Sequence, residues 1–187
     1  MAKQFDCLSQ SHIEFIGRQK IFFTASAAAG TRVNMSPREG GALRVAGANE
    51  VVYLDRTGSG NETAAHMLAD GRLTIMFCAF EGPPLILRLY GQGTSLGWES
   101  AGFSRIVETL YDGKCPSGAR QIMRLTIDLV QTSCGYGVPL FDYQGERAAI
   151  DNWHDNKGPD GIRAYWKDNN QSSMDGLPTG LKLPDDI

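Results

Sequence analysis

The residues best suited to hold a ligand form a short glycine-containing stretch, Thr57-Gly58-Ser59-Gly60-Asn61-Glu62-Thr63. It lies between a predicted strand and a predicted helix start, where free backbone N–H groups carry partial positive charge. The two glycines allow a sharp turn, and Ser59, Asn61 and Thr63 add side-chain donors. These groups could cradle one phosphate. A plain capped turn is the alternative, and the spacing matches neither a dinucleotide fingerprint nor a P-loop.

A second polar set alternates along a predicted strand. Arg32, Asn34 and Ser36 fall on the face opposite Val33 and Met35. A guanidinium, an amide and a hydroxyl on one side of a strand could bind an anion. The alternative is the solvent face of a half-exposed strand. If this strand and the glycine loop are neighbours in the sheet, one phosphate could contact both.

No other group of residues indicates a catalytic or metal centre. The three histidines lack metal-ligand spacing, the four cysteines are widely separated, and no G-x-S-x-G motif occurs. We therefore predict no metal site and leave the catalytic residues unassigned.

The elements that must position these residues are mostly strands. A capping box at Ser11 and Glu14 predicts a first short helix. A second helix is predicted over Glu62–Asp70, capped by Asn61 and followed by Gly71. A third is predicted from the spacing of Phe103, Ile106, Val107 and Leu110, which gives it one apolar face. The predicted strands are Ile21–Ala27, Thr31–Ser36 ended by Pro37, Ala42–Ala46, Val51–Asp55, Arg72–Phe80, Leu85–Gly91 and Arg120–Thr132.

These segments, taken as about six strands with short helices, indicate a mainly β fold, a small antiparallel barrel. The composition changes near the end of the chain, where residues 144–187 are polar and rich in Gly, Pro, Asp and Asn. We predict one domain over residues 1–143, with residues 144–187 as a C-terminal extension that wraps around it.

The overall composition excludes several classes of protein. The chain has 187 residues, 42% hydrophobic and 21% charged, which is ordinary for a folded domain. A net charge of -3 argues against nucleic acid as the main partner. No signal-peptide core or membrane-length apolar run is visible, so we expect a cytoplasmic protein that is not bound to membranes. The 22 glycines indicate many turns.

Four stretches between residues 12 and 94 resemble the pyridoxamine 5'-phosphate oxidase-like, FMN-binding split-barrel family. They are FIGRQKIFFTASA, RVNMSP, VVYLDRTGSGNETAAHML and RLTIMFCAFEGPPLILRLYG. The resemblance implies a six-stranded antiparallel split barrel, FMN as the cofactor, and a homodimer with the flavin at the subunit interface. It implies that Arg32 contacts the flavin phosphate and that the backbone of Val33 and Asn34 lies along the flavin. Tyr53, Ser59, Gly60, Asn61 and Thr63 would complete the phosphate and ribityl site.

The chain departs from the family pattern at three places. Pro37 stands where the family has a lysine, Gly60-Asn61 replaces a basic pair, and the C-terminal substrate motif with arginine and histidine is absent. These differences argue against oxidation of vitamin B6 compounds. The leading hypothesis is an FMN-dependent oxidoreductase acting on another small molecule. The alternatives are a non-enzymatic flavin- or haem-binding module, a relative that uses the deazaflavin F420, and a barrel with no small-molecule site.

Overall fold

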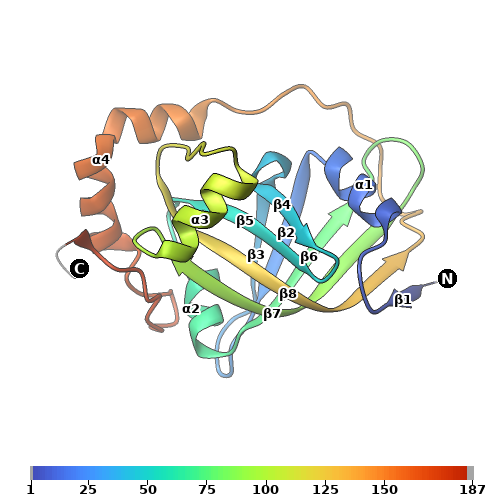
Figure 1. Cartoon of the computed structure of the whole chain (residues 1–187), viewed down its shortest axis with the longest axis horizontal. Coiled ribbons are helices and arrows are strands. Elements are labelled where there is room, and N and C mark those ends of the chain that lie inside the picture. Colours follow the sequence, from blue (N-terminus) through green and yellow to red (C-terminus); the bar gives the residue numbers. More distant parts are fainter. Residues whose placement is uncertain (1, 185–187) are drawn as a thin grey trace.

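The computed structural model describes residues 2–184, so Met1 and the last three residues of the predicted extension lie outside it. Within residues 2–184 the chain forms eight strands and four helices (Figure 1). The strands are β1 (Lys3–Phe5), β2 (Ile21–Ser26), β3 (Asn34–Glu39), β4 (Leu43–Gly47), β5 (Glu50–Arg56), β6 (Arg72–Cys78), β7 (Ile86–Gly97) and β8 (Ala119–Ser133). The helices are α1 (Gln10–Arg18), α2 (Glu62–Ala69), α3 (Ala101–Leu110) and α4 (Ala149–Asn169), with a 3₁₀ turn at Gly40–Ala42.

All the strands belong to one curled antiparallel sheet in the order β3-β2-β6-β7-β8-β5-β4, and β1 pairs with β8. The long strands β7 and β8 run through its middle (Figure 1). A bulge occurs between Tyr90 and Gly91, where a Cβ on Gly91 would lie 1.9 Å from the carbonyl oxygen of Thr126. The predicted antiparallel barrel with short helices is confirmed, with eight strands in place of six.

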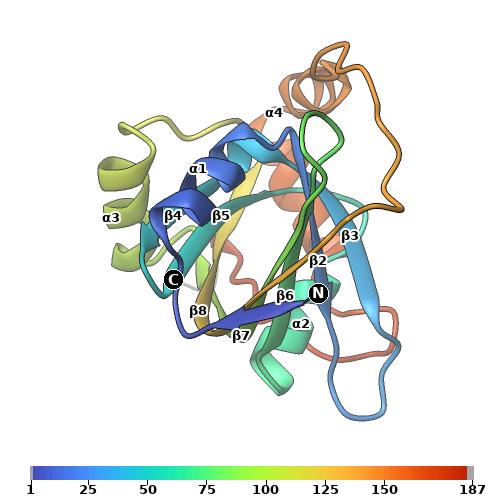
Figure 2. The ribbon, with the colours of Figure 1, turned by 90° about the vertical axis from the view of Figure 1, so that its right-hand side faces the viewer.

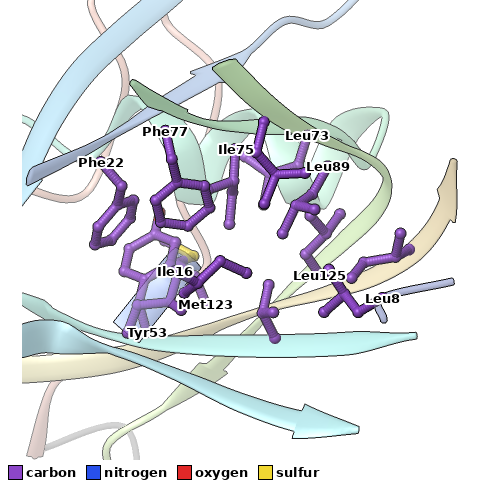
Figure 3. Close-up of a cluster of buried hydrophobic side chains, with 14 of the residues drawn as sticks. Leu8, Ile16, Phe22, Tyr53, Leu73, Ile75, Phe77, Leu89, Met123 and Leu125 are labelled. Carbon is purple, nitrogen blue, oxygen red and sulfur yellow. The ribbon is translucent and has the colours of Figure 1, made fainter. Parts of the chain in front are cut away.

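The sheet buries side chains on both faces. Inside the curl, Phe22 contacts Tyr53 edge to face at 5.4 Å between ring centroids, and aliphatic side chains of β6, β7 and β8 extend the cluster beside them (Figure 3). On the other face, α3 packs Phe103, Ile106 and Val107 against β5 and β8. The predicted apolar face of this helix is confirmed. Strand β5 is therefore covered on both sides, which holds the loop that follows it.

Helix starts differ from the sequence prediction in two places. Ser9, not Ser11, caps α1: its hydroxyl accepts from the backbone N–H of His12 at 3.3 Å, and His12 Nδ1 accepts from Ser9 N–H at 3.2 Å. A histidine thus takes the role in the capping box that was expected of Glu14. Asn61 precedes α2 but makes no side-chain cap. The helix does end as predicted, with Gly71 at a φ of +88°.

Strand β3 begins and ends later than expected. It starts at Asn34 and continues through Pro37 to Glu39, so Arg32 lies before it and Pro37 does not end it. β3 is an edge strand paired only with β2, and an edge strand tolerates proline because its outer side needs no ladder hydrogen bonds. The consequence is that Arg38 joins Asn34 and Ser36 on one face of the strand.

The C-terminal extension contains a long helix that the sequence analysis missed. α4 bends at Gly158, whose φ is +64°, and Pro159 follows it. This break and the weak apolar pattern hide the helix, which buries only His154, Ile162 and Trp166. A connection over residues 134–148, here called the strap, links β8 to α4 and stands away from the barrel (orange in Figure 2). Within residues 2–184, no helix is long and apolar enough to span a bilayer.

Candidate functional site

The loop between β5 and α2 lines a cavity of about 340 Å³, here called the cradle, with one face of β3 and one side chain of β8. Five of the residues predicted to bind the cofactor line it: Asn34, Ser59, Gly60, Asn61 and Thr63. The other lining residues are Ser36, Pro37, Arg38, Gly58, Glu62 and Arg120. The structure thus brings Asn34 and Ser36 of the second polar pattern, but not Arg32, to the glycine loop.

The start of α2 is left open toward the cradle. Asn61 does not cap it because its Oδ1 accepts a 2.6 Å hydrogen bond from Gln121 Nε2 of β8. Its Nδ2 is buried and has no partner within the described chain. Gly58 and Gly60 both lack a positive φ, so the turn itself does not require glycine. A Cβ on Gly58 would instead project into open space.

Two buried or half-buried arginines supply positive charge. Arg38 Nη1 donates to Asp55 Oδ1 at 2.7 Å, and Arg120 Nε donates to Asp55 Oδ2 at 2.8 Å. Asp55 is fully buried, and its Oδ2 also accepts from Gln121 Nε2 at 2.7 Å. Burial would raise the pKa of Asp55, but Arg120 and Arg38 lower it below the usual value. Two guanidiniums thus share one buried carboxylate, and Glu62 brings a second carboxylate to the cradle lining.

The opposite wall of the cradle is fixed by neutral hydrogen bonds. Asn34 Nδ2 donates to Thr63 Oγ1 at 3.1 Å and lies 3.4 Å from Ser26 Oγ. Ser26 Oγ is in turn 3.0 Å from His66 Nδ1 on α2. This chain ties β2, β3 and α2 together and sets the orientation of the Asn34 amide.

Three residues assigned to the cofactor by resemblance lie elsewhere. Arg32 is largely exposed and pairs with Asp175 of the C-terminal extension. Val33 is 74% exposed and directly precedes the edge strand β3. Tyr53 lies inside the barrel core, where burial raises its pKa to about 12. None of the three lines the cradle.

Sequence reasoning missed the two arginines that do line the cradle. Arg38 carried a usable signal, because continuing the alternation of Asn34 and Ser36 past Pro37 places it on the same face. Arg120 carried none. Its position follows from the pairing of β5 with β8, where Asp55 lies opposite Gln121, and no local pattern reports such pairing between distant segments.

A larger cavity of about 1220 Å³ adjoins the cradle, with Pro37 and Arg38 lining both. It lies between the barrel end and the strap. The strap is attached by Phe141, whose N–H donates to the Phe80 carbonyl at 3.0 Å, and by Lys20 Nζ, 5.4 Å from the centre of the Tyr143 ring. We call it the strap cavity.

No cluster of three or more His, Cys, Asp or Glu side chains suited to a metal ion occurs within residues 2–184. The donor set of the cradle, guanidinium, amide, hydroxyl and backbone N–H, suits an anion such as a phosphate.

Comparison with known proteins places the chain in a family. No family model matches it. The pyridoxamine 5'-phosphate oxidase family protein ustO of Aspergillus flavus is 38% identical over 141 residues, which are 74% of this chain and 56% of that protein. The chain belongs to the pyridoxamine 5'-phosphate oxidase-like split-barrel family. It matches little more than half the length of that relative.

Solved structures of this split-barrel family share the fold at low sequence identity. A histidine-to-alanine variant of HupZ from Group A Streptococcus superposes with a TM-score of 0.53 and 15% identity, over 67% of this chain and 98% of that one. A Lactobacillus delbrueckii protein, thought to be a pyridoxamine 5'-phosphate oxidase, gives a TM-score of 0.53 and 11% identity over 67% and 94%. These similarities support the predicted fold.

Proposed function

We propose that this protein binds FMN with its phosphate in the cradle and acts as an FMN-dependent oxidoreductase on a small molecule. The observation that carries the proposal is the pair of guanidiniums, of Arg38 and Arg120, that share the buried Asp55 beside the uncapped start of α2. Such a site attracts an anion through both the guanidinium charge and the helix dipole.

The residues of the cradle fit a phosphate. The unpartnered Nδ2 of Asn61 and Nε of Arg38 are donors that a bound oxyanion would satisfy. Ser59 and Thr63 add hydroxyl groups, and the open space over Gly58 lets an anion approach the backbone. Bound FMN would supply hydride or electron transfer, which these side chains cannot perform. Their part is to bind and orient it.

The residues assigned only by resemblance remain part of the proposal as contacts to the rest of the flavin. Arg32 would have to exchange Asp175 for the phosphate, since the two are paired. The backbone of Val33 would run beside the flavin, and Tyr53 would act from within the core, behind Arg38, which lies 5.6 Å from its ring centre.

The strap cavity is our proposed substrate site. It shares Pro37 and Arg38 with the cradle, so a small molecule inside it would lie next to a cofactor bound there. Its walls include the apolar side chains of Phe141, Tyr143 and Ile150. The departures at Pro37 and Gly60-Asn61 are the reason we propose a substrate other than a vitamin B6 compound.

We also propose a homodimer in the cytoplasm, with the flavin at the interface. Val33 and Met35, 74% and 68% exposed, leave apolar surface on the edge of the sheet beside the cradle. The four cysteines are all free, as is usual in a reducing compartment.

The absorption spectrum of the protein purified without added cofactor tests the proposal. We expect flavin absorption, or quenching of flavin fluorescence when FMN is added. The absence of both signals would contradict FMN binding, and a deazaflavin or haem spectrum would replace FMN with that cofactor. Turnover of NADH or NADPH by the flavin-loaded protein then separates an enzyme from a binding module, because a module holds the cofactor without catalysing its reduction.

A further inference from the structure

The C-terminal extension reaches the cradle through one side chain, Asn170. This residue follows the last turn of α4 and is completely buried. Its Oδ1 accepts a 2.8 Å hydrogen bond from Arg120 Nη1, and its Nδ2 donates to the Gly58 carbonyl at 3.2 Å. A single amide therefore links an arginine of the cradle to the cradle loop.

The backbone of Asn170 is held as firmly as its side chain. Its N–H donates to the Trp166 carbonyl at 3.0 Å, and its carbonyl accepts from Thr179 Oγ1 at 2.7 Å. Trp166 itself donates from Nε1 to Thr57 Oγ1 at 2.7 Å, one residue before Gly58. The hydrogen bonds of the Asn170 backbone and of the neighbouring Trp166 side chain thus hold the Asn170 side-chain amide in place.

Arg120 depends on this contact for its orientation. Its Nε donates to Asp55, and its Nη2 donates to the Gly60 carbonyl at 2.9 Å. Asn170 takes an N–H of Nη1, the remaining nitrogen. Because a guanidinium has five N–H groups in a rigid plane, one N–H on each Nη atom is left for an anion. The hydrogen bonds to Asp55, Asn170 and Gly60 use all three nitrogens of this guanidinium and so determine where its two remaining N–H groups point.

The same segment also restrains Glu62, the acidic residue at the start of α2. Met174 N–H donates to Glu62 Oε1 at 3.0 Å and Oε2 at 3.2 Å. A carboxylate at this helix start would compete with a phosphate for the same backbone N–H groups. Tying it to residue 174 reduces that competition.

We infer that Asn170 is a positioning residue of the cradle, and that through it the C-terminal extension makes the site select phosphorylated over unphosphorylated flavin. This inference rests on the proposed function. Asn170 does not line the cradle. It acts through Arg120 and Gly58, so its loss should weaken the binding of the flavin phosphate more than that of the flavin ring.

Fluorescence titration of the full-length protein with FMN and with riboflavin tests the inference, since the two ligands differ only in the phosphate. We expect Asn170→Ala to weaken FMN binding by about ten-fold and riboflavin binding by less than about two-fold. The matched control is Asn169→Ala, because Asn169 is the exposed neighbour whose side-chain amide donates to the Tyr165 carbonyl of its own helix. It should change neither affinity.

A purely structural role for Asn170 predicts a different result. In that case Asn170→Ala would weaken the binding of both flavins equally or leave both affinities unchanged, and either outcome overturns the inference. The proposed function would still stand as long as the wild-type protein binds FMN more tightly than riboflavin. A wild-type protein that binds FMN no better than riboflavin would overturn the phosphate assignment itself. If Asn170→Ala does not fold, the isosteric Asn170→Asp serves instead: it loses the donor to Gly58, adds negative charge beside Arg120, and should lose FMN selectively.

Discussion

At the scale of single residues, the cradle depends on how one carboxylate is shared. Asp55 lies in the core of the molecule, where an unpaired charge would be strongly destabilising. Arg38 and Arg120 each use one nitrogen to neutralise it. The donors they keep are already desolvated and oriented, so an incoming phosphate meets them at little further cost.

Replacing the two candidate arginines separately distinguishes their roles. We expect Arg38→Ala to raise the dissociation constant for FMN about ten- to a hundred-fold, the value of a charge-assisted hydrogen bond of about 1.5–3 kcal/mol. Arg32→Ala should have a smaller effect, because Arg32 is 71% exposed and paired with Asp175. Isothermal titration of both variants checks this. If Arg32→Ala weakened FMN binding more than Arg38→Ala did, Arg32 would be the phosphate contact, as the family resemblance implies.

At the scale of elements, α4 is held to the barrel by a buried histidine. Arg56 Nη2 lies 3.0 Å from His154 Nδ1, and His154 Nε2 lies 3.0 Å from the Thr57 carbonyl. An arginine only donates and a carbonyl only accepts, so His154 is neutral with its proton on Nε2. Thr57 directly precedes the cradle loop, so the docking of α4 on Thr57 helps to hold that loop in position.

The docking of α4 should weaken in mild acid. Burial holds the pKa of His154 below its usual 6.5, with the charge of Arg56 acting in the same direction. A histidine with a lowered pKa stabilises the fold above pH 6.5 and loses that contribution as pH falls below it, by at most about 1.4 kcal/mol per pH unit.

Urea unfolding at several pH values between 7 and 5 measures this dependence. His154→Gln should make the free energy of unfolding less dependent on pH, because glutamine does not titrate. His12, whose pKa burial also lowers, would account for the slope that remains. An unchanged slope in His154→Gln would show that His154 titrates alike in the folded and unfolded chain.

At the scale of the whole molecule, the described part of the curled sheet ends in two edge strands, β3 and β4. β3 has no partner on its outer side within residues 2–184, and it carries the exposed Met35 next to Val33. Exposed edge strands with apolar side chains tend to associate. Asn34 of β3 lines the cradle, so this edge strand borders the proposed cofactor site. A cofactor bound there would lie at an interface formed by the edge.

Sedimentation equilibrium tests the proposed dimer. The wild-type chain should give a mass of about 41 kDa, twice the 20.4 kDa of one chain. Met35→Lys should shift the population toward single chains, because it buries a charge in the proposed interface. Met174→Lys is the matched control, since Met174 is 72% exposed on the C-terminal extension. A wild-type mass of one chain, or an equal effect of the two variants, would contradict the proposal.

The local parts of the fold were predictable from the sequence. Alternation located most strands, the apolar spacing in residues 103–110 located α3, and Gly71 marked the end of α2. The loop from Gly58 to Thr63 was recognised as a possible phosphate cradle because its signal is contained in consecutive residues. The cap of α1 was misplaced because two serines, Ser9 and Ser11, compete within three positions.

The charged groups of the cradle were decided by tertiary structure. Arg38, Asp55, Arg120 and Asn170 come from β3, β5, β8 and the end of α4. They meet because the sheet pairs β5 with β8, because it curls so that β3 comes close to β5, and because α4 folds back over the loop. Sequence periodicity reports which face of an element a residue occupies. It does not report which distant element will cover that face, because strand pairing and helix docking follow from the packing of the whole core.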